Sequence, residues 1–256
     1  MTRRRRAPFV ALTQLLQRRH PKLENATELV VAGRVVVDGA SITNLNATVR
    51  SDASIRVLTP RRLRGELKLA AALDAFRLSV AGAVAVDIGA AAGGFTSELL
   101  DRGAARVYAV DVGFGQLAGR LRADDRVVNL ERTNVASLDT DIVHEVVDLV
   151  TIDLSYLPVA EAMPSLRRLR LASDAALVLV ALIKPTFELR AGSVVTDPQA
   201  VRTAIQLGAE AVEAAGWQPK ACTVPAVTGA GGAVEAFVLA RRGARQAPAR
   251  RERAAR

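Results

Sequence analysis

The chain has one cysteine, few aromatic residues and no long hydrophobic run. Because Cys222 is the only cysteine, no internal disulfide can form, and a reducing, cytoplasmic compartment is expected. Aromatic residues occupy 4% of the 256 positions, too few for a platform that stacks single-stranded bases. The longest strongly apolar run, residues 175–183, is shorter than the roughly 20 residues that cross a bilayer, so no membrane span is expected.

Acidic residues are fewer than basic residues. The 35 lysines and arginines face 26 aspartates and glutamates, which gives a formal charge of +9. Such an excess favours a polyanionic partner, either nucleic acid or an anionic membrane, although an arginine-rich soluble surface gives the same balance. Residues 1–8 and 242–256 predict disordered basic ends, which either contact RNA phosphates or are simply solvated. The four arginines near the start precede no apolar run, so no secretory signal is expected.

Residues 9–59 predict a small α+β domain. Leu12, Leu15 and Leu16 form the apolar stripe of a first helix. A capping box at Asn25–Glu28 opens a second helix, which Gly33 ends. Short strands are expected at 35–37 and 55–58, and a turn is expected at 38–39. Residues 60–65 are expected to form a linker to the next domain.

Residues 66–241 alternate apolar strands with helical patterns. This order predicts an α/β domain of the Rossmann-like type, with a mostly parallel seven-stranded sheet covered on both faces. The expected strands are 84–88, 107–110, 127–129, 149–153, 176–182, 221–224 and 236–240. The expected helices are 67–76, 95–102, 159–169 and 198–215. No internal repeat is visible.

A loop of small residues follows the first strand of this domain. Glycine and alanine let a ligand approach the backbone closely, although the spacing differs from the dinucleotide pattern and a tight turn without a ligand remains possible. An acid at the end of the next strand is suited to accept hydrogen bonds from both hydroxyls of a cofactor ribose. The sequence therefore predicts a nucleoside-type cofactor, held by Asp87, Gly89, Ala90, Gly93, Gly94, Phe95, Asp111, Val112, Asn134 and Asp153.

Lysine is scarce, with only Lys22, Lys68, Lys184 and Lys220 in the chain. Lys184 and Asp153 lie at the carboxyl ends of predicted neighbouring strands, where open α/β sheets bind ligands. Unlike arginine, a lysine can lose its proton when burial and a nearby cation lower its pKa, so it can act as a base toward a hydroxyl. An ordinary ion pair between Lys184 and Asp153 is the alternative reading.

Several stretches together resemble the TlyA family, whose catalytic domain is FtsJ-like. The likeness covers nearly all of residues 9–240 and is carried by 65–69, 87–96, 100–105, 110–118, 129–134, 153–156, 184–188 and the Gly-Gly-x-Val-Glu run ending at Glu235. The chain departs from the family pattern at Glu24–Asn25, Glu66, Thr186 and Ala233.

The resemblance implies an S-adenosylmethionine-dependent methyltransferase that acts on a ribose 2′-hydroxyl, of a cytidine, in ribosomal RNA or ribosomal subunits. It implies a catalytic tetrad of Lys68, Asp153, Lys184 and Glu235. The positions of the strands themselves lead us to expect that Asp87 faces the amino group of the cofactor and that the strand end Asn129–Asn134 contacts adenine. The resemblance also implies that residues 9–59 bind RNA, for which the candidate side chains are Arg18, Arg19, Lys22 and Arg34.

Three other functions remain open from the sequence. The chain could bind RNA or a ribosomal subunit without transferring a methyl group. It could be a membrane-active lysin, although no long basic amphipathic helix with aromatic anchors is visible. It could methylate a small molecule, which the basic excess and the additional domain disfavour. His20 and His144 stand apart with no third ligand, so no metal site is predicted.

Overall fold

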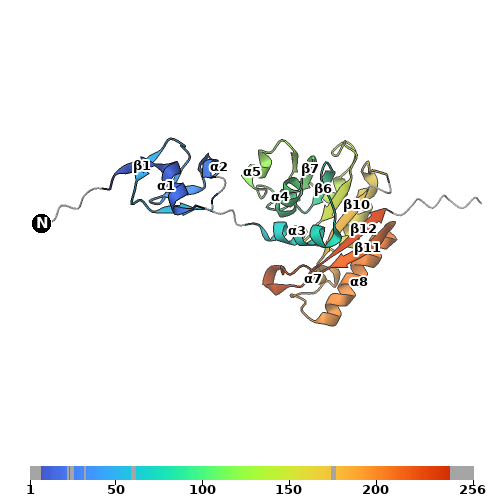
Figure 1. Cartoon of the computed structure of the whole chain (residues 1–256). Coiled ribbons are helices and arrows are strands. Elements are labelled where there is room, and N and C mark those ends of the chain that lie inside the picture. Colours follow the sequence, from blue (N-terminus) through green and yellow to red (C-terminus); the bar gives the residue numbers. More distant parts are fainter. Residues whose placement is uncertain are drawn as a thin grey trace, which may run out of the picture. The chain divides into compact units, whose positions relative to one another are not determined.

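The computed structural model describes residues 7–21, 23, 26–31, 33–58, 62–173 and 177–242. The chain divides into two compact units between Arg61 and Arg62, each of which is described by itself (Figure 1). Most of the two predicted basic ends, together with Lys22 and Asn25, lies outside the described residues.

Among its described residues, the first unit contains two small antiparallel sheets and two helices. Its elements are β1 (Phe9–Ala11), α1 (Leu12–Arg19), α2 (Ala26–Val31), β2 (Val35–Val37), β3 (Ala40–Ile42), β4 (Thr48–Arg50) and β5 (Ile55–Val57). Strand β1 pairs with β4, while β2 lies between β3 and β5. The predicted apolar stripe is confirmed, because Leu12, Leu15 and Leu16 are all buried in the core of this unit.

The predicted turn joins β2 to β3. Asp38 and Gly39 have φ angles of 48° and 89°, the left-handed pair that a tight hairpin requires and that aspartate and glycine adopt most readily. Gly33, which follows α2, also has a positive φ of 67°, as expected of a residue that ends a helix. Strands β1, β3 and β4 were not predicted, because three residues are too few to show an alternating pattern.

The second unit is built on the predicted seven-stranded sheet. Its strands are β6 (Val84–Ile88), β7 (Arg106–Val110), β8 (Val127–Leu130), β9 (Leu149–Ile152), β10 (Val178–Ile183), β11 (Trp217–Thr223) and β12 (Ala236–Arg242). Their order across the sheet is β11-β12-β10-β9-β6-β7-β8. Strand β12 runs antiparallel to β10 and β11, and the remaining pairs are parallel, so the mostly parallel Rossmann-like fold is confirmed.

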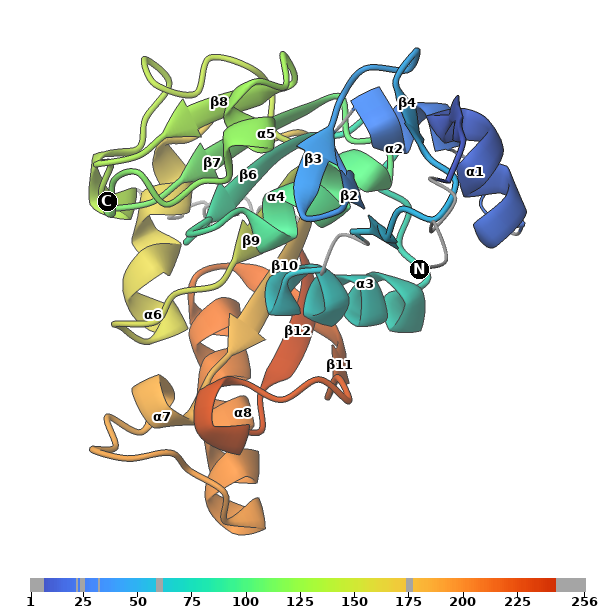
Figure 2. The same cartoon turned by 90° about the vertical axis from the view of Figure 1, so that its left-hand side faces the viewer.

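Helices cover both faces of this sheet. They are α3 (Arg64–Phe76), α4 (Gly94–Asp101), α5 (Gly119–Arg122), α6 (Val159–Ala162), α7 (Pro185–Glu188) and α8 (Pro198–Ala214). Three 3₁₀ turns span Val135–Ser137, Met163–Arg168 and Ala230–Gly232. Apolar side chains of α3, α4 and α5 form one core, and those of α6 and α8 form the other. Helices α3 and α4 lie side by side (Figure 2).

Three predicted boundaries are wrong. Helix α3 begins at Arg64, inside the stretch 60–65 that was expected to be a linker. The helix predicted over 159–169 changes to a 3₁₀ turn at Met163, because Pro164 has no N–H to donate and its ring clashes with the preceding turn. Strand β11 begins at Trp217 rather than 221, and it accommodates Pro219 because it is an edge strand.

The strand register determines what lies at the carboxyl edge of the sheet. Ile88 lies beside Val110 on one side and Ile152 on the other. The residues that follow these strands therefore emerge together, with the loop after β6 between Asp111 and Asp153. Ile183 pairs with Ala236, so Lys184 and Glu235 also leave neighbouring strands at this edge. This is where open α/β sheets bind their ligands.

Candidate active site

The loop after β6 depends on two glycines that approach other parts of the chain closely. A Cβ atom on Gly89, whose φ is 87°, would lie 2.2 Å from the carbonyl oxygen of Asp153. A Cβ atom on Gly93, whose φ is 90°, would lie 2.2 Å from a methyl group of Leu121. Ala91 also has a positive φ, of 46°, so the loop bends sharply.

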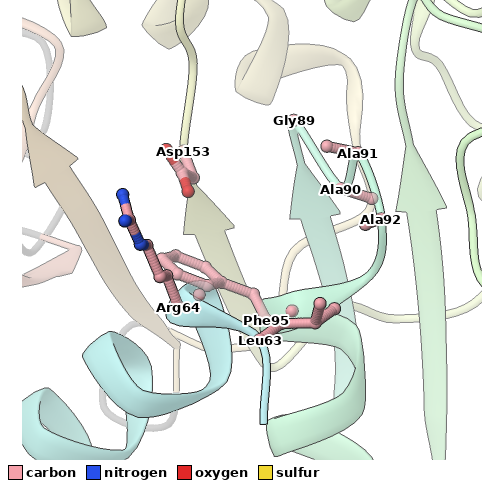
Figure 3. A pocket seen from close by; sticks show the side chains of 10 residues that line it. Leu63, Arg64, Gly89, Ala90, Ala91, Ala92, Phe95 and Asp153 are labelled. Carbon is pink, nitrogen blue, oxygen red and sulfur yellow. The ribbon is translucent and has the colours of Figure 1, made fainter. Parts of the chain in front are cut away.

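A cavity of about 230 Å³ opens between this loop, the start of α3 and the end of β9 (Figure 3). Its lining consists of Leu63, Arg64, Gly65, Gly89, Ala90, Ala91, Ala92, Gly94, Phe95 and Asp153. The predicted cofactor residues of the loop that contribute to this lining are Gly89, Ala90, Gly94 and Phe95. The Oδ1 atom of Asp153 is buried and forms an ion pair with the Lys184 amine. The cavity therefore offers small backbone groups on one wall and an anionic oxygen on another.

Asp111 lies on the other side of the loop, at the end of β7. Its Oδ2 atom accepts a hydrogen bond from Ala91 N at 2.9 Å, and its Oδ1 atom accepts one from Gly113 N at 2.7 Å. Each oxygen retains a free lone pair for a further donor. A small hollow beside Asp111 is lined partly by Val112, Thr133, Val135 and Tyr156, which gives this end of the site an apolar wall.

Asn134 does not line that hollow, although the residues on both sides of it do. Its side-chain oxygen accepts a hydrogen bond from Ala136 N at 2.9 Å and so caps the 3₁₀ turn over Val135–Ser137. The structure therefore gives the Asn134 side chain a local structural contact.

Asp87 lies beneath the loop and outside the cavity. Its side chain is completely buried, and its two oxygens accept hydrogen bonds from Thr96 Oγ1 at 2.7 Å and Thr151 Oγ1 at 2.9 Å. Burial raises the pKa of Asp87 to about 6 against the lowering effect of these two hydroxyls. The expected contact with a cofactor amino group is therefore not the geometry observed, because both oxygens face α4 and β9.

Two lysines and two carboxylates form two ion pairs at the carboxyl edge. Lys68, on α3, donates a hydrogen bond to Glu235 Oε2 at 2.5 Å, and both side chains are buried. Lys184 forms an ion pair with Asp153 and donates a hydrogen bond to Ser155 Oγ at 2.5 Å. The Lys184 side chain is 12% exposed, so it remains within reach of a ligand. The structure places all four predicted catalytic residues on elements that meet at this edge.

Sequence reasoning missed two polar residues of this site. Ser155 contacts the Lys184 amine, and Arg64 lines the cavity. Ser155 lies within the Asp-Leu-Ser-Tyr motif that was recognised, but serine is too common for its position to indicate a role. Arg64 was assigned to the linker, and the helix that places it in the cavity was predicted to begin later.

The arginines predicted to bind RNA differ in their surroundings. Arg19 donates hydrogen bonds to the carbonyl oxygens of Ala53 and Ser51, and Arg34 Nε donates one to Leu58 O at 3.1 Å. These two side chains thus hold segments of the first unit together. Arg18 is exposed at the end of α1.

The described residues contain no group of three or more metal-ligating side chains, and none of their helices is long and apolar enough to cross a membrane. His144 is exposed and contacts Tyr108 edge-on. Trp217 is buried in the hydrophobic core, where its side chain packs against other apolar residues.

Comparison with known proteins identifies relatives that match most of the chain. The family model of the FtsJ-like methyltransferases matches residues 61–242. The 16S/23S rRNA (cytidine-2′-O)-methyltransferase TlyA of Mycobacterium tuberculosis is 40% identical over 227 residues, which cover 85% of this chain and 84% of the relative. Hemolysin A of Brachyspira hyodysenteriae is 33% identical over 172 residues, which cover 66% of this chain and 70% of the relative.

A solved structure from Streptococcus thermophilus, described provisionally as a hemolysin, superimposes with a TM-score of 0.65 at 30% identity. The superposition covers 92% of this chain and 89% of that chain. The similarity thus includes both the sequence and the fold of most of the chain. The chain belongs to the TlyA family of FtsJ-like, S-adenosylmethionine-dependent methyltransferases.

Proposed function

We propose that this protein transfers a methyl group from S-adenosylmethionine to the 2′-hydroxyl of a ribose, that of a cytidine, in ribosomal RNA. One observation carries the proposal: a lysine held by a carboxylate and a hydroxyl lies at the sheet edge, and that same carboxylate lines the cavity beside the glycine-alanine loop. Asp153 thus contacts the proposed base, Lys184, and also lines the proposed cofactor site.

The residues present suit S-adenosylmethionine. The Asp111 carboxylate retains acceptor capacity for ribose hydroxyls, and the apolar residues Val112 and Val135 lie close to it, which suits an adenine ring. The cavity on the other side of the loop is lined by the Asp153 carboxylate, whose negative charge suits a positively charged amino group. Close backbone approach at Gly89 leaves room for a ligand that a larger residue would displace.

When bound, S-adenosylmethionine supplies an electrophilic methyl group on its sulfonium. The protein must then remove the proton of the attacking hydroxyl. Lys184 is the candidate base, once its ammonium group has released a proton to solvent, because it combines partial burial with an accessible amine. Ser155 and Asp153 fix the direction of that amine through the contacts described above. After accepting the proton, Lys184 is stabilised by Asp153 and returns the proton to solvent.

Lys68 and Glu235 are proposed to orient the ribose. Their ion pair is almost completely buried, and such a pair holds its geometry because breaking it leaves an uncompensated charge. Both residues lie at the same sheet edge as Lys184, one on α3 and one directly before β12. Positioning the hydroxyl in line with the reacting carbon contributes a large part of the rate in reactions of this kind.

The substrate class follows from the relatives and from the charge of the chain. The TlyA relative is named as a methyltransferase of cytidine 2′-hydroxyls in 16S and 23S rRNA, and the excess of positive charge suits a polyanionic substrate. We propose that the protein acts on ribosomal subunits in the cytoplasm, and that the first unit binds RNA through residues such as Arg18.

Transfer of labelled methyl groups to purified ribosomal subunits tests the proposal. The wild type is expected to label the RNA, whereas Lys184→Ala should lower kcat by at least about 100-fold, the usual loss of a general base. Lys220→Ala, at an exposed lysine of β11, controls for lost charge and should retain activity. Cofactor binding without transfer by the wild type would instead indicate an RNA-binding protein without activity.

A further inference from the structure

Arg64 is the cationic residue of the cavity whose role the proposed mechanism leaves open. It is the first residue of α3 and lines the cavity together with the loop after β6 and with Asp153. Figure 3 shows its side chain extending along the cavity wall toward the end of β9, where Asp153 lies. The side chain is exposed, and its guanidinium makes no hydrogen bond or ion pair with the residues that the structure describes.

Two other arginines, Arg62 just before α3 and Arg120 on α5, have different surroundings. Arg62 pairs with Glu98 and Glu66, and Arg120 pairs with Glu66 at 3.0 Å. These guanidiniums thus neutralise buried carboxylates between α3, α4 and α5. Because Arg64 takes no part in this network, its charge remains available to a ligand in the cavity.

The two ends of the cofactor can be assigned to the two sides of the loop. Asp111 and the apolar residues near it, Val112 and Val135, lie on the β7 side and suit the ribose and adenine. The methionine end must then lie on the β9 side, in the cavity that Arg64 and Asp153 share. An α-amino acid carries one carboxylate and one ammonium group. The Arg64 guanidinium is complementary in charge to the carboxylate, and the Asp153 carboxylate is complementary to the ammonium group.

We infer that Arg64 binds the α-carboxylate of the methionine end of S-adenosylmethionine, opposite Asp153, which faces the α-ammonium group. A guanidinium suits this task because its fork of N–H donors matches the two oxygens of a carboxylate. The inference rests on the proposed function. It adds to that function a residue that recognises the complete methionine part of the cofactor and does not bind a ligand from which this part is missing. An RNA phosphate is the other anion that Arg64 could meet, but a phosphate there would lie close to the Asp153 carboxylate.

Calorimetry with two ligands tests the inference without any turnover. S-adenosylhomocysteine contains the complete amino-acid arm, whereas 5′-methylthioadenosine lacks it. Loss of a charge-assisted, two-pronged hydrogen bond should weaken S-adenosylhomocysteine binding by about 10- to 100-fold in Arg64→Gln. Binding of 5′-methylthioadenosine should change by less than about twofold, since that ligand has no carboxylate to lose. Arg64→Lys should restore part of the affinity.

Arg77→Gln is the matched control, because it removes an exposed arginine from the other end of the same helix. It should leave the affinity for both ligands unchanged. Equal weakening of both ligands in Arg64→Gln would overturn the inference in favour of a structural role. Unchanged affinity for both, with a raised KM for ribosomal subunits, would overturn it in favour of an RNA phosphate. A wild type that binds neither ligand would overturn the proposed function itself, and the inference with it.

Discussion

Replacing Asp87 with asparagine should change how the stability of the protein depends on pH. Asp87 is completely buried, and its pKa is raised from 3.8 to about 6. Between these two values the folded protein binds a proton that the unfolded chain has already released. Stability from this group is therefore greatest below pH 3.8 and is lost as the pH rises through about 6.

The magnitude follows from the size of the shift. Each pKa unit corresponds to about 1.4 kcal/mol, so complete ionisation of Asp87 costs on the order of 3 kcal/mol. Asparagine cannot ionise, yet its amide can bond to both threonine hydroxyls, since a hydroxyl both donates and accepts. The unfolding free energy of Asp87→Asn, relative to wild type, should therefore rise by about 2 kcal/mol between about pH 4.5 and about pH 7.5.

Urea unfolding at both pH values measures this difference. The comparison cancels the contributions of the other titrating groups, which the two proteins share. Asp74→Asn is the control that should show little change between these two pH values, because Arg102 lowers the pKa of that exposed carboxyl and its contribution to stability is lost only at lower pH. A pH-independent difference between Asp87→Asn and wild type would refute the view that Asp87 is desolvated beneath the loop.

Two further predictions concern close backbone contacts. Gly89→Ala should destabilise the fold by about 2 to 4 kcal/mol, because its Cβ meets a backbone carbonyl and its φ is positive. Gly82→Ala, with a similar φ but no atom within 4 Å, should cost only about 1 kcal/mol in the same urea experiment. Gly94→Ala, whose Cβ would lie 2.9 Å from the Cα of Gly65, should cost about 1 to 3 kcal/mol and weaken methyl transfer by displacing α3. Gly119→Ala, with open space around it, should change neither quantity appreciably, and equal effects within either pair would contradict the contacts described.

The sequence predicts best those elements whose signal is local. Strand β6 was predicted at its observed bounds because an apolar strand followed by small residues has few alternatives. Helix α3 was predicted too short, since Arg64 and Gly65 have no apolar periodicity, and the close packing of Gly65 against Gly94 is a tertiary contact without a local sequence signal. Strand β11 was misplaced because Pro219 argues against a strand, and its edge position cannot be read from the sequence.

The candidate site shows the same division. The acids at the strand ends were found because parallel strands bring their carboxyl ends together. The direction in which each side chain points was harder to predict, as Asp87 illustrates. It lies between Val86 and Ile88, whose side chains pack in the core beneath α6 and α8, so strand alternation turns Asp87 toward α4 and away from the cavity. The partner of Lys184 at Ser155 depends on a loop conformation with no sequence signature.

The central claim is that the Lys184 amine removes a proton from a ribose hydroxyl of ribosomal RNA. A map of 2′-O-methylation in ribosomal RNA tests it most directly, taken from cells that lack this protein and from cells complemented with the wild type or Lys184→Ala. The account predicts that a cytidine 2′-O-methyl group is lost with the protein, returns with the wild type and stays absent with the variant. Full methylation restored by Lys184→Ala, or a map unchanged by loss of the protein, would contradict it.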